Sequence, residues 1–175
     1  PDMVYLLLTN NQSFHSLYRS TDAGISFSLR SDSPNIMDWS TLGTGTGGQA
    51  WYNLALAASP VNANLIHAGG VNIWSSSDGG ITWQINAHWT GSGGAPAVHA
   101  DCHYLGYSPG GRLFAGNDGG VYHTDNAGVS WTEVSSGLAI SQIYKLGQSA
   151  TIRDRVMTGY QDNGTALYAG SGWVT

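Results

Sequence analysis

The sequence predicts an all-β chain assembled from repeated units of about four short strands. Its composition is the first reason: 25 of the 175 residues are glycine, seven are tryptophan, and only 10% are charged. Short strands joined by tight turns suit this composition better than helices do. The second reason is a motif that occurs three times at intervals of about 50 residues, which is the signature of a repeat architecture.

The repeated motif is an octapeptide with a hydroxyl residue, an Asp or Asn, a Gly and an aromatic residue at fixed positions. Asp22 and Asp78 are 56 residues apart, and Asp78 and Asn126 are 48 apart. Asp and Ser side chains can close a turn by accepting hydrogen bonds from backbone N–H groups. Glycine supplies the positive φ of a tight hairpin, and the aromatic residue begins the next strand and packs into the core. We call these turns boxes one, two and three; their defining residues are Ser20, Asp22, Gly24 and Phe27, then Ser76, Asp78, Gly80 and Trp83, then Thr124, Asn126, Gly128 and Trp131.

Each box is preceded by β-type segments. In the first unit, residues 4–8 form an apolar run, and residues 17–19 lead into box one. The polar segment 30–48, which ends in a Gly- and Thr-rich run, is predicted to be a flexible surface loop. Because Asn126 takes the aspartate position in box three, we expect that turn to be slightly weaker than the other two.

The later units repeat one order of strands and turns. The second has strands predicted at residues 51–57, 65–70 and 71–75, and the third at 101–107, 112–116 and 121–123. A fourth opens with strands at 143–147, 155–159 and 166–168, and no clear fourth box follows. About four strands per unit make one blade of a β-propeller, and propellers use about four to eight blades.

The chain is therefore predicted to be one partial β-propeller domain covering residues 1–175. It contains about three and a half four-stranded blades, at approximately 1–30, 49–88, 99–136 and 141–175. Such a segment cannot close a ring by itself. We expect it to belong to a larger propeller of about seven blades, with the remaining blades supplied by the same longer chain or by a partner chain.

Charge and hydropathy exclude some classes of partner. The formal net charge is −5, from 11 acidic and six basic residues, which argues against binding a nucleic-acid backbone. No apolar run is long enough for a transmembrane helix, so no membrane insertion is expected. The single Cys102 cannot form an intrachain disulfide.

The three boxes resemble the Asp-box (bacterial neuraminidase) repeats of sialidases, xyloglucanase-type propeller hydrolases and sortilin-type receptors. Four further segments, at residues 48–54, 98–103, 116–122 and 161–165, are similar to the sortilin-like propeller region of large secreted proteins from bacteria with type IX secretion. The resemblance implies an extracellular or cell-surface location. It also implies that the start of each blade's first strand and the loop between its second and third strands lie at the mouth of the central channel, with the boxes on the opposite face.

One candidate site is the sequence His-x-Asp-x-His at His99, Asp101 and His103. Alternating residues share one side of a strand, so these three could bind a divalent metal, contact a ligand or form a polar network between blades. His99 and His103 would lie about 13 Å apart along an ideal strand. A site that uses all three residues therefore needs a bulge or bend. No other cofactor is expected.

Asp118 and Asp162 follow strand-ending glycines at matching places in the third and fourth units. Aspartate before a turn residue commonly caps the turn. Together with Asp101, however, the two could supply the paired carboxylates of a glycosidase. Aromatic residues that could stack on sugars are Trp51, Tyr52, Trp89, Tyr160 and Trp173. Trp51 and Trp89 are expected to pack between blades instead.

These features favour a non-catalytic, extracellular β-propeller module that binds a glycan or a protein as part of a larger adhesin-like protein. The alternative is a glycoside hydrolase of the xyloglucanase type with Asp101, Asp118 or Asp162 as acid and base. The expected ligand-binding residues are His99, Asp101, His103, Asp118, Asp162, Trp51 and Tyr160.

Overall fold

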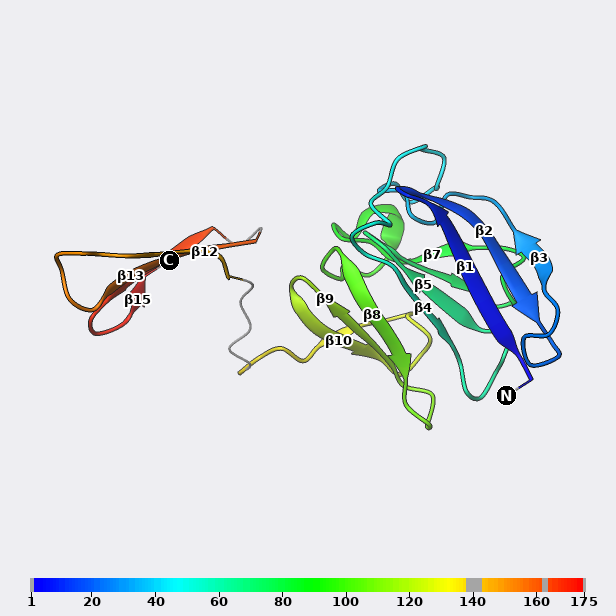
Figure 1. Cartoon of the computed structure of the whole chain (residues 1–175). Coiled ribbons are helices and arrows are strands. Elements are labelled where there is room, and N and C mark those ends of the chain that lie inside the picture. The colour runs from blue at the N-terminus through cyan, green and yellow to red at the C-terminus, as the bar shows by residue number, and fades with distance from the viewer. Residues whose placement is uncertain (1, 138–142, 162–163, 175) are drawn as a thin grey trace. The chain divides into compact units, whose positions relative to one another are not determined.

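The computed structural model describes residues 2–137, 143–161 and 164–174, and its strands form four antiparallel sheets (Figure 1). In every sheet the strands follow one another in sequence order. The first sheet contains β1 (Val4–Asn10), β2 (Ser13–Ser20) and β3 (Ser28–Ser31). The second contains β4 (Ala55–Ala58), β5 (Ile66–Gly69), β6 (Ile73–Ser76) and β7 (Gln84–Ala87).

The third sheet contains β8 (Cys102–Tyr107), β9 (Leu113–Asn117), β10 (Gly120–Thr124) and β11 (Thr132–Glu133). The fourth contains β12 (Ile143–Gln148), β13 (Arg155–Tyr160), β14 (Thr165–Ala169) and β15 (Trp173–Val174). The one described helix is the three-residue 3₁₀ turn η1 (Ser92–Gly94), and no described helix is long and apolar enough to cross a bilayer. The chain is thus all-β, and its up-and-down sheets of three or four strands are blades of a partial β-propeller, as the sequence predicts.

The chain divides into two compact units, Pro1–Ser136 and Gly137–Thr175. The first holds the first three sheets, and the second holds only the fourth.

The boxes are the turns before the last strand of each of the first three sheets. In box two, Ser76 Oγ accepts a hydrogen bond from Gly80 N at 2.8 Å, and Asp78 Oδ1 accepts from Thr82 N at 3.0 Å. Box one has the matching bonds, and its Gly24 has φ +90°, close to the +86° of Gly80. Only glycine adopts such φ values at low cost, which explains its place in the motif.

Asn126 preserves the turn in box three. Its Oδ1 accepts from Ser130 N at 3.0 Å, as the aspartates do from their equivalents. Its Nδ2 donates to Ser130 Oγ at 2.9 Å, whereas in box two the Thr82 hydroxyl donates to Asp78 Oδ2 at 2.6 Å. The amide therefore reverses the direction of one hydrogen bond and keeps the set of contacts.

The hydrophobic core lies between the sheets of the first unit. One cluster joins the first and second sheets and includes Phe14, Leu17, Ile66 and Trp74. A second cluster joins the second and third sheets and includes Ile73, Cys102, Leu105 and Leu113. Strand β8 lies against β4 and β5, so the first strands of these two blades are neighbours.

Two segments differ from the sequence-based expectations. Segment 30–48 is not a free surface loop, because Ile36 and Met37 are fully buried and Asp38 Oδ2 accepts hydrogen bonds from Ser40 Oγ and Gly45 N. The strand predicted at residues 51–57 begins only at Ala55. The residues before it form a turn in which Tyr52 N and Asn53 N both donate to Gln49 O.

The first sheet has three strands because box one follows its second strand, whereas boxes two and three follow the third strand of their sheets. Strand β1 therefore corresponds to β5 and β9, and the position equivalent to β4 and β8 lies beside the free edge of β1. The β-type run predicted at residues 4–8 is confirmed as part of β1, and residues 17–19, which lead into box one, belong to β2.

Candidate functional site: a polar and aromatic cluster at the start of β8

The start of β8 and the turn between β9 and β10 come together, as the sequence predicts. Cys102 pairs with Asn117, the residue before Asp118, and His103 Nε2 lies 2.8 Å from Asp118 Oδ1. The Asp118 side chain is 5% exposed, and that of His103 is 39% exposed. A carboxylate accepts hydrogen bonds only, so Nε2 of His103 carries the donated proton. In neutral histidine, Nδ1 is then the acceptor.

Tyr52 completes this group from the turn before β4. Its hydroxyl donates to Asp118 Oδ2 at 2.8 Å, and its ring meets the His103 ring edge-on, with centroids 4.9 Å apart and planes at 87°. Both oxygens of Asp118 therefore accept a hydrogen bond. In the described part of the chain these two contacts, and not a turn cap, occupy Asp118, which joins the second and third blades.

Asp101 forms a second connection between the same two blades. Its Oδ1 accepts hydrogen bonds from Gln49 Nε2 and, at 2.7 Å, from the buried Asn53 Nδ2. Both donors belong to the turn that replaces the predicted start of β4. Asp101 itself has φ +67°, a left-handed conformation that Asp tolerates better than most residues. This backbone bend turns the chain into β8.

His99, Asp101 and His103 do not share one side of a strand. Strand β8 begins only at Cys102, and a register shift between Cys102 and Tyr104 places a bulge at His103. The His99 ring packs on Gly119, where an added Cβ would lie 2.3 Å from His99 Cγ, and His99 Nδ1 lies 3.1 Å from Ala100 O. Among the described residues, no group of three His, Cys, Asp or Glu side chains could hold a metal ion. Asp101 and His103 each take part in polar contacts between the second and third blades, whereas the ring of His99 makes its polar contact with the adjacent Ala100. Ligand contact, the third interpretation of this motif, stays a prediction.

An exposed tryptophan borders the network. Trp51 is 66% exposed, and its ring centroid lies 5.7 Å from that of Tyr52. The prediction that Trp51 and Trp89 pack between blades is wrong, since Trp89 is also 51% exposed. The residues that do pack between blades are the box residues Trp83 and Trp131.

The remaining candidates lie in the second unit. Tyr160 ends β13 and is half-buried, and the exposed Trp173 begins β15 beside Tyr168. Asp162 lies outside the described residues. The first unit alone therefore brings together Trp51, Tyr52, Asp101, His103 and Asp118.

Sequence reasoning missed the roles of Gln49 and Asn53 and the link from Tyr52 to Asp118. The sequence predicts a strand that begins at residue 51, so Gln49 before it and Asn53 within it would lie well apart. A helical-type turn instead brings residues four apart to one side, so both amides reach Asp101. The pair of amides four residues apart was the available signal.

Comparisons with known proteins agree with the fold. No protein-family model matches the sequence, and no curated protein matches it. Among solved structures, the GH74 xyloglucanase from Xanthomonas campestris is 17% identical with a TM-score of 0.56; the match covers 99% of this chain and 28% of that enzyme. An ancestral GH74 enzyme is 12% identical, with a TM-score of 0.43 over 98% of this chain and 25% of that one.

A structure of YCF48 bound to D1 peptide is 15% identical, with a TM-score of 0.42 over 91% of this chain and 46% of that one. The chain thus spans less than half the length of each of these structures. The similarity to the Xanthomonas campestris enzyme, with its TM-score of 0.56, concerns the fold alone and supports a partial β-propeller.

Proposed function

We propose that the chain is a non-catalytic β-propeller module that binds a glycan through the surface formed by Trp51, Tyr52, His103 and Asp118. The observation that carries this proposal is an exposed indole beside side chains that are already fixed by hydrogen bonds. An exposed tryptophan ring offers a flat apolar surface to the C–H face of a sugar, while its surroundings supply polar contacts. The side chains are pre-organised, which lowers the entropy cost of binding.

The carboxylates of this surface suit binding better than acid–base catalysis. A glycosidase needs one carboxyl group beside the leaving-group oxygen and another facing a water molecule or the sugar carbon. Asp118 is nearly buried and accepts a bond on each oxygen, and Asp101 accepts two bonds on one oxygen. A reducing-sugar assay would detect hydrolysis if it occurred.

The test is a glycan array probed with the 175-residue chain, the Trp51→Ala variant and the Trp89→Ala variant. Trp89 is a matched control because its side chain is also exposed. Its ring stacks on His88, which is not part of the proposed surface. We expect Trp51→Ala to lose the array signal and Trp89→Ala to retain it.

A reducing-sugar assay on each glycan that binds detects turnover, and turnover that Asp118→Asn abolishes would contradict the non-catalytic proposal. Binding of proteins but of no glycan would contradict the choice of ligand.

We further propose that the module works outside the cell or on its surface, within a larger secreted protein, as the resemblance of segments 48–54, 98–103, 116–122 and 161–165 implies. The remaining blades would come from the same longer chain or from a partner chain. The open face of the first sheet supports this, because Leu6, Phe27 and Leu29 are exposed there. Phe27 occupies the position at which Trp83 and Trp131 pack against the preceding blade.

A further inference from the structure

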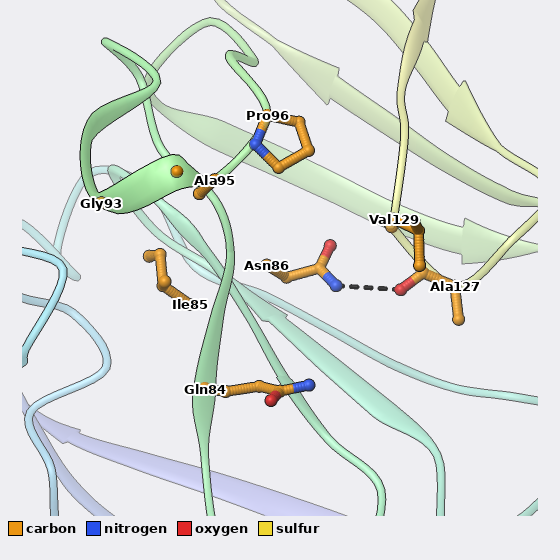
Figure 2. Close-up of a pocket in the computed structure, with 10 residues that line it drawn as sticks. Gln84, Ile85, Asn86, Gly93, Ala95, Pro96, Ala127 and Val129 are labelled. Atoms are coloured by element: carbon orange, nitrogen blue, oxygen red, sulfur yellow. Dashed lines mark hydrogen bonds between the residues drawn. The ribbon is translucent and has the colours of Figure 1, made fainter.

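A groove of about 280 Å³ lies between the second and third blades, and its lining residues differ from those of the cluster around Asp118. One wall is β7, with Gln84, Ile85 and Asn86. The other walls are the turn at residues 93–96 and the box-three residues 127–129. Figure 2 shows the Asn86 side chain between these walls, with its amide nitrogen directed at the carbonyl of Ala127.

Asn86 occupies the same position in its blade as Arg30 in the first blade. Each is the third residue after the aromatic residue of its box, Trp83 and Phe27 respectively. Each also reaches the next box along the chain, since Arg30 Nε donates to Gly79 O at 2.8 Å and Asn86 Nδ2 donates to Ala127 O at 2.9 Å. Gly79 and Ala127 are the equivalent fourth residues of boxes two and three.

The two side chains differ in reach. Arg30 makes a second contact, in which Nη2 donates to Asp78 O at 2.9 Å. Its guanidinium is thus bound by two backbone carbonyls of the neighbouring turn. Asparagine has two fewer methylene groups than arginine and ends in a smaller amide, so Asn86 reaches Ala127 O, the equivalent of Gly79 O. Asn86 and Ala127 both line the groove.

The orientation of the Asn86 amide suits a cationic donor in the groove. Trp131 Nε1 lies 3.3 Å from Asn86 Oδ1, which assigns the oxygen to that side and the nitrogen to Ala127. An amide oxygen has two lone pairs, so it can accept a further hydrogen bond. Gln84 adds a second amide, and Gly93 and Gly94 add backbone without side chains. The net charge of −5 favours a cationic over an anionic partner.

We propose that this groove binds a guanidinium group, carried by an arginine side chain of a partner polypeptide. The planar guanidinium presents five N–H donors, and carbonyl and amide oxygens can accept them. The first blade junction already uses this chemistry within the chain, through Arg30. The proposal is independent of glycan binding, because its residues are separate from Trp51, Tyr52, His103 and Asp118.

The test uses the 175-residue chain labelled with ¹⁵N and two capped tripeptides, glycine–arginine–glycine and glycine–lysine–glycine. The two have the same charge and differ in the cationic group. The arginine peptide should shift the amide signals of Gly94, Gly128 and Val129 in a saturable way, and the lysine peptide should bind at least about tenfold more weakly. Equal binding of the two peptides, or no shift with either, would overturn the proposal. Methylguanidinium chloride distinguishes the guanidinium group alone from the peptide around it.

Two variants sharpen the test. Asn86→Arg should place the chain's own guanidinium in the groove, so it should abolish peptide binding and raise the melting temperature above that of Asn86→Ala. Unchanged peptide binding by folded Asn86→Arg would contradict the assignment. If that variant does not fold, Arg30→Ala provides the reciprocal measurement at the first junction. Millimolar methylguanidinium should raise its melting temperature more than equal sodium chloride does, and no such difference would count against a guanidinium slot.

Discussion

Trp83 Nε1 donates a 2.9 Å hydrogen bond to Ser31 Oγ, which joins box two to the last strand of the preceding sheet. Trp131 repeats the relationship in box three, where Nε1 donates to Asn86 Oδ1 at 3.3 Å. The aromatic residue of each of these boxes thus both fills the core and fixes the register between blades. The motif that repeats most often serves the stacking of blades, and the candidate binding surface lies among other residues.

The first prediction concerns this bond. Trp83→Phe keeps an aromatic ring and removes the N–H donor, leaving Ser31 Oγ without that partner. We expect a loss of about 1–2 kcal/mol in the free energy of unfolding, measured by urea denaturation. Trp131→Phe should cost less, because its bond is longer. An equal or larger loss in Trp131→Phe would show that ring volume, and not the hydrogen bond, dominates.

The second prediction concerns the aspartate of box two. Asn126 shows that an amide preserves the turn, so Asp78→Asn should cost less stability than Asp78→Ala, which removes every side-chain acceptor. Losing a turn cap of this kind typically costs about 1 kcal/mol. Thermal unfolding of the two variants measures the difference. A similar loss in both would mean that the carboxylate charge is essential.

The charge of Asp78 should matter at neutral pH and lose its effect in acid. Partial burial opposes ionisation, but hydrogen bonds from Thr82, Ser76 and Ile81 outweigh it and hold the pKa of Asp78 well below its usual value of 3.8. A carboxylate with a lowered pKa stabilises the fold above the pKa of the unfolded chain, and this contribution is lost as the pH falls through the folded pKa. Asp78→Asn should therefore differ least from the wild type below about pH 4.

The third prediction concerns the fully buried His67, which joins the second and third blades. Its Nε2 lies 3.3 Å from Ala127 O, and Tyr107 OH lies 2.9 Å from its Nδ1. Burial lowers the pKa of His67 to about 4. Because the unfolded chain binds this proton more readily, stability should fall by about 3 kcal/mol as the pH drops from about 6.5 to 4. Urea denaturation across this range should give a shallower pH dependence for His67→Gln, and an unchanged slope would assign the effect to other groups.

The fourth prediction concerns Asp101. Asp101→Ala would leave Gln49 and the buried Asn53 without their acceptor, at a cost of about 1–3 kcal/mol. Asp101→Asn keeps an acceptor oxygen and tolerates the positive φ, so it should cost less. Melting temperatures of the two variants measure the order. If the melting temperature of Asp101→Asn were no higher than that of Asp101→Ala, the negative charge, and not the acceptor oxygen alone, would hold the two amides.

Much of the fold could be predicted from the sequence, because the motif, the strand periodicity and the turn residues all act locally. The ends of the strands predicted at residues 101–107, 112–116 and 155–159 agree with those of β8, β9 and β13 to within about one or two residues. This is the usual uncertainty in where a secondary-structure element ends. The first sheet could also be recognised as partial. The strand predicted from residue 51 begins only at Ala55, because the turn at residues 49–53 is held by contacts with Asp101, which is far away in sequence.

The candidate site was predictable only in part. That Asp118 would lie near His103 followed from the order of strands in a blade. The bulge at His103 and the left-handed Asp101 could not be foreseen, because alternation along an ideal strand was the only available rule. The exposure of Trp51 and Trp89 is likewise a tertiary property, since apolar residues occur both between blades and on surfaces.

The central claim is that Trp51 and the neighbouring Tyr52–His103–Asp118 network form a glycan-binding surface. Isothermal titration calorimetry with the glycan that gives the strongest array signal tests it most directly, using the wild type, Trp51→Ala and Trp89→Ala. We expect Trp51→Ala to weaken binding by about 2 kcal/mol or more, roughly 30-fold in the dissociation constant, and Trp89→Ala to bind as the wild type does. Equal affinity of Trp51→Ala and the wild type would contradict the claim.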